Sequence, residues 1–180
     1  MTVSLAPDSL RLRPLALADA PVLARLLHAN RSFLAPTSPL RTDDYFSDAG
    51  QERTIRASLE AAERGEIAPM VLVVHGEVVG TLNLNSIIRG AFQSASIGYW
   101  VSRERNGEGI ASRAVALAKV VAADQLALHR LQAETLVDNV ASQKVLVRNG
   151  LVRYGTAPDY LKIAGRWQEH ALFQVTFPQR

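Results

Sequence analysis

The chain contains no cysteine, and its few histidines do not gather at any one point of the sequence. The absence of cysteine excludes disulfides, thiolate metal sites and cysteine nucleophiles together. No two histidines stand at the spacing of a metal-ligand pair, so we expect no metal site. The four histidines are His28, His75, His129 and His170.

Long apolar runs and strong charge clusters are also absent. No run approaches the ~18–20 apolar residues that span a bilayer, and the first residues lack the basic segment and apolar stretch of a signal peptide. The 20 basic residues are spread along the chain rather than clustered, which disfavours a nucleic-acid surface. We therefore expect a cytoplasmic protein with no membrane or nucleic-acid partner.

Length and patterning indicate one mixed α/β domain that covers residues 1–180. Hydrophobic residues make up 48% of the chain, and no linker or repeat divides it. Apolar periodicity predicts four helices, and we expect Asp19 and Asn139 to cap two of them and Gly65 and Gly150 to end two. Strands are predicted at residues 10–13, 70–74, 78–84, 95–101, 131–137, 151–162 and 167–177.

The most informative segment lies between a predicted strand and a predicted long helix that continues to Leu126. Its sequence is Asn106-Gly107-Glu108-Gly109-Ile110-Ala111. Two glycines separated by one residue let the main chain turn tightly and bring successive N–H groups to one point. Together with the positive end of the following helix, these groups form an anion site, so a phosphate ligand is the first expectation.

Two well-known phosphate-binding patterns do not fit this segment. In the dinucleotide-binding pattern, the third glycine or alanine would fall on Ser112. The region about 20 residues further on, where that pattern needs an acidic residue after a strand, is still predicted helix. A Walker loop is excluded because the chain has no Gly-Lys-Ser/Thr.

The order of segments around the loop resembles the GNAT acetyltransferase superfamily, from about Leu10 to Phe177. It is most similar to the RimJ/RimL-type enzymes, which acetylate the N-terminal alanine of ribosomal proteins. The resemblance implies a mostly antiparallel twisted sheet of about seven strands with about four helices, and a splayed parallel strand pair at the cofactor site. Beside the loop, it is carried by Ser-Ile-Gly-Tyr-Trp-Val at 96–101, His-Arg-Leu-Gln-Ala at 129–133, Asn-Val-Ala-Ser at 139–142 and Tyr-Leu-Lys-Ile-Ala-Gly-Arg-Trp at 160–167.

The resemblance implies that the loop holds the pyrophosphate of the co-substrate acetyl-CoA. Relatives carry Gln or Arg in place of Asn106, a change of little weight because main-chain N–H groups do the binding. Arg103, Arg105 and Arg113 either add charge near the phosphates or are ordinary surface residues. Asn139 either caps its helix or bonds the pantetheine arm. The implied cofactor-binding residues are Tyr99, Trp100, Val101, Asn106, Gly107, Glu108, Gly109, Ile110, Ala111, Asn139 and Ser142.

Acetyl transfer from a thioester needs a neutral amine, a donor for the carbonyl oxygen and a proton for the leaving thiolate. The absence of cysteine favours direct attack by the amine in a ternary complex. The resemblance implies main-chain N–H groups of residues 99–101 as the donors. It also implies Glu134 as a base acting through water, unless Glu134 is an ordinary half-exposed strand residue. Some relatives carry a tyrosine acid where this chain has Leu146. The candidate acid is therefore Ser142, unless its hydroxyl bonds back to its own helix.

A protein N-terminus is the expected acceptor. Its α-amine has a reference pKa of ~7.7–8.0, so roughly a tenth is neutral at pH 7, whereas well under a thousandth of a lysine at ~10.4 is neutral. A modest base therefore suits an N-terminus better. Tyr160 and Trp167 flank the last predicted hairpin turn and either line the acceptor groove or pack that hairpin. Acetylation of a small amine (a polyamine, amino acid or aminoglycoside) and a non-catalytic CoA-binding role are the alternatives, and a homodimer is compatible with the sequence.

Overall fold

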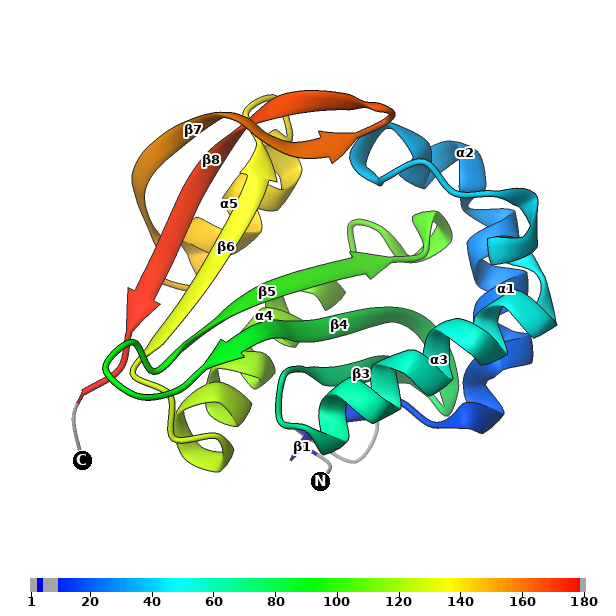
Figure 1. Ribbon diagram of the computed structural model, residues 1–180, viewed down its shortest axis with the longest axis horizontal. Helices are drawn as coiled ribbons and strands as arrows, with labels where there is room; N and C mark the ends of the chain where they lie inside the picture. The colour runs from blue at the N-terminus through cyan, green and yellow to red at the C-terminus, as the bar shows by residue number, and fades with distance from the viewer. Residues whose placement is uncertain (1–2, 5–9, 179–180) are drawn as a thin grey trace.

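All seven strands expected from the sequence form, and they join one sheet. The computed structural model describes residues 3–4 and 10–178, and a two-residue strand, β1, brings the sheet to eight strands. The order across the sheet is β1-β2-β3-β4-β5-β6-β8-β7 (Figure 1). The strands are β1 (Val3–Ser4), β2 (Arg11–Pro14), β3 (Ala68–Val74), β4 (Glu77–Ile88), β5 (Ser94–Val101), β6 (Arg130–Leu136), β7 (Val152–Ile163) and β8 (Arg166–Thr176).

One pair of neighbouring strands is parallel, and all the others are antiparallel. The parallel strands are β5 and β6, which pair only through residues 94–96 and 130–132. Past these residues β5 remains paired with β4 as far as Val101, and β6 remains paired with β8 as far as Leu136. The two parallel strands therefore diverge, as Figure 1 shows, and the splayed pair implied by the resemblance is confirmed.

Five α-helices accompany the sheet in the described part of the chain, one more than expected. The additional helix, α2 (Arg31–Leu34), is a single turn. The helix after the glycine loop, α4 (Ile110–Val120), is shorter than predicted because the chain widens into a π-helical turn, in which the N–H of Leu126 bonds to the carbonyl of Val121. The others are α1 (Ala20–Ala29), α3 (Asp48–Glu63) and α5 (Val140–Arg148), and 3-10 turns cover Leu17–Asp19, Ala35–Thr37, Asp43–Phe46 and Arg103–Arg105.

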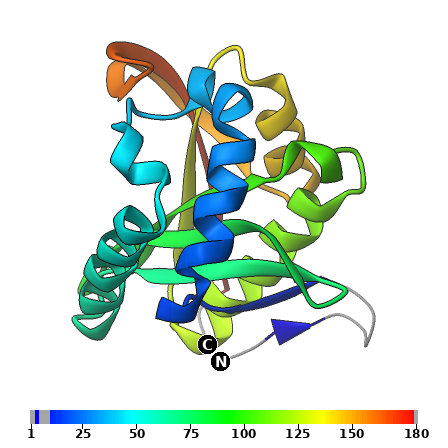
Figure 2. The same ribbon diagram turned by 90° about the vertical axis from the view of Figure 1, so that its right-hand side faces the viewer.

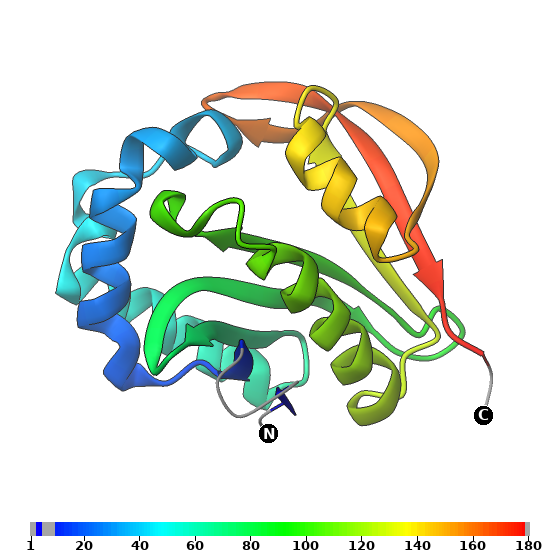
Figure 3. The ribbon, with the colours of Figure 1, turned by 180° about the vertical axis from the view of Figure 1, so that it is seen from behind.

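The helices cover the two faces of the sheet unequally. α4 and α5 lie on one face (Figure 3), where Leu84, Ile97 and Leu131 contribute to the main core. α1 and α3 lie on the other face, and their smaller core includes Val71 and Val73 of β3. Figure 1 shows no helix over β5 and β6 on this second face. Because side chains alternate along a strand, the even-numbered residues of β5 and β6 point to this uncovered face.

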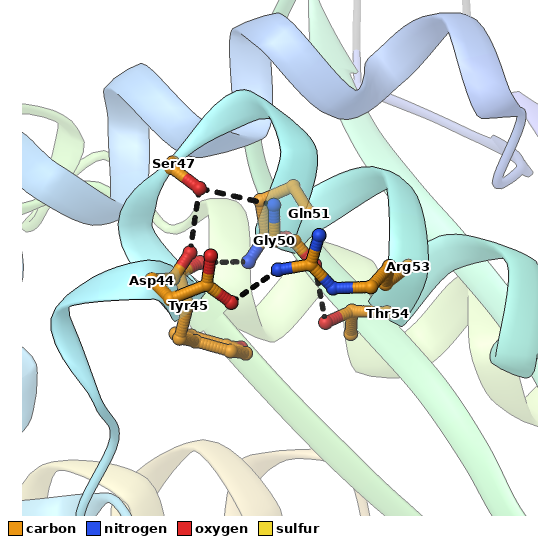
Figure 4. Close-up of polar contacts among 7 residues, drawn as sticks. All are labelled: Asp44, Tyr45, Ser47, Gly50, Gln51, Arg53 and Thr54. Atoms are coloured by element: carbon orange, nitrogen blue, oxygen red, sulfur yellow. Dashed lines mark hydrogen bonds and ion pairs between the residues drawn. The ribbon is translucent and has the colours of Figure 1, made fainter.

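A hydrogen-bonded turn fixes the start of α3 (Figure 4). The Ser47 hydroxyl accepts from the N–H of Gly50 at 3.0 Å and donates to the carbonyl of Asp44 at 2.7 Å. The amide of Gln51 donates to the carbonyl of Tyr45 at 2.6 Å. A side chain at position 50 would meet the Asp44 carbonyl oxygen at 1.9 Å, so glycine is required there. The turn thus anchors the segment that leads from α2 to α3.

The capping role expected of Asp19 is wrong. Its backbone is helical, and its carboxylate bonds to residues before it rather than to the first turn of α1. The guanidinium of Arg13 donates to both carboxylate oxygens at 2.8 and 2.6 Å, and the N–H of Ala16 donates at 2.9 Å. Burial raises the pKa of Asp19, but these hydrogen bonds and the Arg13 charge outweigh it and lower the pKa overall. The ion pair therefore holds β2 to the start of α1.

We expect Asp19→Asn to lower the free energy of unfolding at pH 7 by about 1–3 kcal/mol, because it leaves the Arg13 guanidinium without its ionic partner. The folded-state pKa of Asp19 is below its unfolded value, so its contribution is complete above the unfolded pKa and disappears as the pH falls through the folded one. Urea unfolding at pH 7 and near pH 3 measures this. Asp43→Asn, which removes an exposed partner of Arg31, is the control and should change stability by under about 1 kcal/mol. Equal losses in the two variants at pH 7 would contradict the assignment.

Candidate active site

The glycine loop presents a row of free main-chain donors at the start of α4. Gly107 and Gly109 have φ angles of 89° and 73°, in the left-handed region that favours glycine. Among the described residues, the first N–H that bonds back at this helix start is that of Arg113, to the carbonyl of Gly109. The N–H groups of residues 107–112 are therefore available to a ligand. A cluster of free N–H groups at a helix N-terminus suits an anion, so the phosphate site expected from the sequence stays a prediction that this geometry allows.

Two of the three arginines near the loop form hydrogen bonds to Glu108, a residue of the loop itself. Arg105 forms an ion pair with Glu108 through two hydrogen bonds of 2.8 and 3.0 Å. Arg113 donates to the carbonyl of Glu108 at 3.2 Å. Glu108 is thus neutralised, and an acidic side chain in the loop does not oppose a phosphate ligand.

A buried asparagine that sequence reasoning gave no role connects this loop to α1. The Asn30 side chain accepts from the N–H of Arg103 at 2.8 Å and donates to the Ser102 hydroxyl at 3.2 Å. It also donates to the carbonyl of Leu26, four residues earlier. Asn30 therefore fixes the chain that leaves β5 toward the glycine loop. The sequence signals only a polar residue at a helix end, because its partners lie 72 and 73 residues away.

The gap between β5 and β6 exposes main-chain groups of β5. The N–H of Ser102 bonds to Val79 of β4 at 2.8 Å. Because main-chain groups alternate along a strand, those of Tyr99 and Val101 then point the opposite way, toward the gap. The expectation that residues 99–101 offer main-chain donors there agrees with this direction for Tyr99 and Val101, whereas the Trp100 groups point to β4.

On the α5 side of the gap, two hydroxyl groups meet. The Tyr99 and Ser142 oxygens are 3.0 Å apart. Burial raises the pKa of Tyr99, although the bond to Ser142 lowers it in part, so the phenol stays protonated at neutral pH. Asn139 caps α5 as predicted, accepting from the N–H of Ser142 at 3.1 Å. The sequence pattern did not foresee the Tyr99 contact, because the two residues are 43 positions apart.

Thr135, on the same side of β6, carries a buried hydroxyl with no hydrogen-bond partner in the described part of the chain. A buried polar group without a partner costs free energy, so a ligand that supplies one is favoured here.

Asn149 holds the two helices of this layer together: its amide donates to the carbonyl of Ser112 in α4 at 3.1 Å and to that of Val145 in α5 at 2.9 Å.

Glu134 lies on the opposite, uncovered face of β6. Its carboxylate accepts a hydrogen bond from the hydroxyl of Ser96 on β5. Burial, followed by electrostatic interaction with Glu134 and Tyr154, raises the pKa of Tyr160. Tyr160 on β7 is therefore close enough to the Glu134 carboxylate to interact with it electrostatically. Adjacent side chains of a strand point to opposite faces, so Glu134 points to the uncovered face and Thr135 to the α5 face. The candidate base Glu134 and the candidate acid Ser142 of α5 therefore lie on opposite faces of the sheet, at the same gap.

The segment after α2 contacts the turn between β7 and β8, and together they border the uncovered face. The N–H of Ala164, in the turn between β7 and β8, donates to the carbonyl of Ser38 at 2.9 Å. The side chain of Leu40 lies against Gly165, at 2.8 Å from where a Cβ would stand. Figure 2 shows the segment after α2 meeting the hairpin tip. Trp167 is 59% exposed and lines a surface hollow of about 320 Å³ beside β6.

Comparison with known proteins agrees with this geometry. Residues 9–152 match the family model of the acetyltransferase (GNAT) domain. The chain is 35% identical over 168 residues to the probable N-acetyltransferase YjcK of Bacillus subtilis, covering 92% of this chain and 93% of YjcK. It is 29% identical over 178 residues to the ribosomal protein uS5-alanine N-acetyltransferase of Escherichia coli, covering 98% and 92%.

A solved structure of a relative has the same fold. Mycobacterium smegmatis RimJ, in complex with CoA-disulfide, superposes with a TM-score of 0.93 at 30% identity, covering 98% of this chain and 87% of that one. No helix in the described residues is long and apolar enough to cross a membrane. The chain belongs to the GNAT acetyltransferase family, is of the ribosomal-protein acetyltransferase type, and takes its acetyl group from acetyl-CoA.

Proposed function

We propose that this enzyme acetylates the N-terminal α-amine of a protein, with Glu134 as base and Ser142 as proton donor. The observation that carries the proposal is the position of these two side chains on opposite faces of the sheet, at the gap between β5 and β6. An amine on the uncovered face and a thioester on the α5 face can then meet within the gap. A ribosomal protein N-terminus, the acceptor named for the Escherichia coli relative, is the model acceptor.

The residues on the α4 and α5 side fit acetyl-CoA, which supplies the acetyl group as a thioester. The free N–H groups of residues 107–112 suit its pyrophosphate. The main-chain N–H groups of Tyr99 and Val101 suit the acetyl carbonyl oxygen as donors, and their carbonyls and the unpaired hydroxyl of Thr135 suit the amides of the pantetheine arm. Asn139 caps α5 through its side-chain oxygen, and its amide N–H₂ has no partner in the described part of the chain, so it can bond the same arm.

Glu134 takes the proton from the acceptor amine, directly or through one water. Its carboxylate is held by the Ser96 hydroxyl, and no basic side chain of the described residues is bonded to it. A base of this kind suits an α-amine, of which roughly a tenth is already neutral at pH 7. Tyr160, protonated because its pKa is raised, can donate to the carboxylate or to the acceptor chain.

Ser142 supplies a proton to the departing sulfur. The two hydroxyl oxygens are 3.0 Å apart, and in the proposed mechanism the Tyr99 phenol is the donor, which leaves the Ser142 proton free to point toward the thioester. A serine hydroxyl is a weak acid, so as its proton moves to the sulfur its oxygen takes the proton of the Tyr99 phenol along the same hydrogen bond, and solvent afterwards returns a proton to the phenol. Tyr99 therefore acts through Ser142.

The test of the acceptor uses one peptide that starts with alanine and carries an internal lysine. We expect acetylation at the α-amine only, located by fragment-ion mass spectrometry. The same peptide with a blocked N-terminus, and the polyamine spermidine, should react at least about 100-fold more slowly. Faster acetylation of spermidine than of the peptide would favour the small-amine alternative, and no turnover of any amine would favour a non-catalytic CoA-binding role.

We expect Glu134→Gln to lower kcat by about 10- to 1,000-fold near pH 7, because the amide keeps the Ser96 bond but cannot accept a proton. The loss should shrink above about pH 9, where the α-amine arrives neutral. Ser142→Ala should lower kcat without this recovery, because its proton goes to the sulfur. Glu60→Gln, at an exposed position on α3, is the control. A pH–rate profile in which Glu134→Gln equals the parent throughout would exclude Glu134 as the base.

We expect Gly109→Val to weaken CoA binding by at least about tenfold. A Cβ at Gly109 meets no atom of the described residues within 4 Å, so apart from the strain of a side chain at a φ of 73° the substitution obstructs a ligand that approaches the loop. Gly65→Val is a matched control, since Gly65 has the same φ of 73°, equally open surroundings and no place in the site. Calorimetry on both variants, each checked for folding by its melting temperature, measures the effect. Unchanged affinity in a folded Gly109→Val would contradict the assignment of the loop.

A further inference from the structure

Two asparagines on β4 point to the same side of the sheet as Glu134, next to the uncovered face of β5 and β6. Asn83 and Asn85 alternate with the fully buried Leu82 and Leu84, so their side chains point away from the main core. Asparagine is depleted in strands because its amide competes for backbone hydrogen bonds. Two of them on one face of a central strand are therefore not explained by strand formation.

The strand register brings both asparagines beside the gap. Asn85 pairs with Ser96 and Asn83 pairs with Gly98 on β5, and Ser96 in turn pairs with Gln132 on β6. The Asn85 amide nitrogen is 3.4 Å from where a Cβ on Gly98 would lie. With no side chain at Gly98, the amides and the Glu134 carboxylate border the same open strip of the sheet.

Neither asparagine amide has a hydrogen-bond partner among the described residues, and both side chains are only partly exposed. By contrast, the neighbouring polar groups of this face are paired: Ser94 with Gln132, Gln132 with Tyr154, and Ser96 with Glu134. The amides of Asn83 and Asn85 are thus half-buried and have hydrogen-bond donors and acceptors that no described residue uses. Such groups are favourably paired by a ligand that lies over them.

We propose that Asn83 and Asn85 form a subsite that binds the main chain of the acceptor polypeptide behind its reactive amine. This subsite rests on the proposed function and gives it a basis for selecting polypeptides. An asparagine amide has the same donor and acceptor as a peptide group, so the two can exchange two hydrogen bonds. The asparagines are two residues apart on one strand, about 6.6 Å, which equals the repeat of an extended peptide.

The same chemistry discriminates against small amines. The non-reacting amines of a polyamine are protonated at neutral pH, carry N–H donors only, and leave the asparagine N–H₂ groups unpaired. A peptide satisfies both kinds of group and gains affinity through main-chain contacts that do not depend on its side chains. Asn83 and Asn85 are therefore specificity-determining residues that act before the chemical step, mainly through KM.

The experiment measures kcat and KM of the parent, Asn83→Ala and Asn85→Ala with the alanine-starting peptide and with alanine N-methylamide, which lacks the second peptide bond. For the peptide we expect KM to rise about 3- to 10-fold in each variant, with kcat within about twofold of the parent. For the short amide the rise should be smaller. Gln125→Ala removes an exposed amide of the π-helical turn, far from this face, and is the matched control. Asn83→Thr and Asn85→Thr repeat the test with a residue that favours strands.

A second measurement identifies the contact. Peptides in which the first or second peptide bond is replaced by an ester lose an N–H donor. With the parent, at least one of these esters should have a higher KM than the unmodified peptide. With the corresponding asparagine variant, the ester and the unmodified peptide should have the same KM. A parent that acetylates the peptide while all asparagine variants match it in KM overturns the subsite and leaves the proposed function intact. A parent that acetylates only small amines overturns the proposed function, and the subsite with it.

Discussion

The divergence of β5 from β6 is the constraint on which the site depends. The strands pair through residues 94–96 and 130–132 and then separate, while β4 and β8 keep their outer edges paired. The gap is therefore held open by the sheet itself, and its free main-chain groups have fixed directions. Because side chains alternate, Glu134 and Thr135 point to opposite faces although they are adjacent. One strand thus provides a group for the amine on one side and a group for the acetyl donor on the other.

Features with a local physical cause were predictable from the sequence. Gly65 and Gly150 end α3 and α5 with positive φ, where only residues tolerant of that conformation fit well. Asn139 caps α5 through its own side chain. The glycine loop at residues 107–109 folds as its two glycines require, because the conformation is set by residues adjacent in sequence. The strands and hairpin turns follow from alternation and turn chemistry for the same reason.

Features that depend on contacts between distant segments were not predictable. Asp19 has the residue type and position of a helix cap, but a tertiary partner, Arg13, takes its carboxylate. The Tyr99–Ser142 bond joins residues 43 positions apart, and nothing in either local sequence indicates it. Asn30 bonds across 73 positions, and only the folded chain makes it a support for the glycine loop. The π-helical turn at Val121–Gln125 also lacks a sequence signal, since alanine-rich segments favour a regular helix.

The central claim is that amine and thioester reach the gap from opposite faces of the sheet and are bound together. A conjugate in which CoA is joined through an acetyl linker to the α-amine of the acceptor peptide occupies both sides at once. Calorimetry should find that it binds at least about tenfold more tightly than CoA alone, because the second contact is intramolecular. The same conjugate linked through an internal lysine should gain little over CoA. An α-amine conjugate that binds no more tightly than CoA, or no more tightly than the lysine-linked form, would contradict the account.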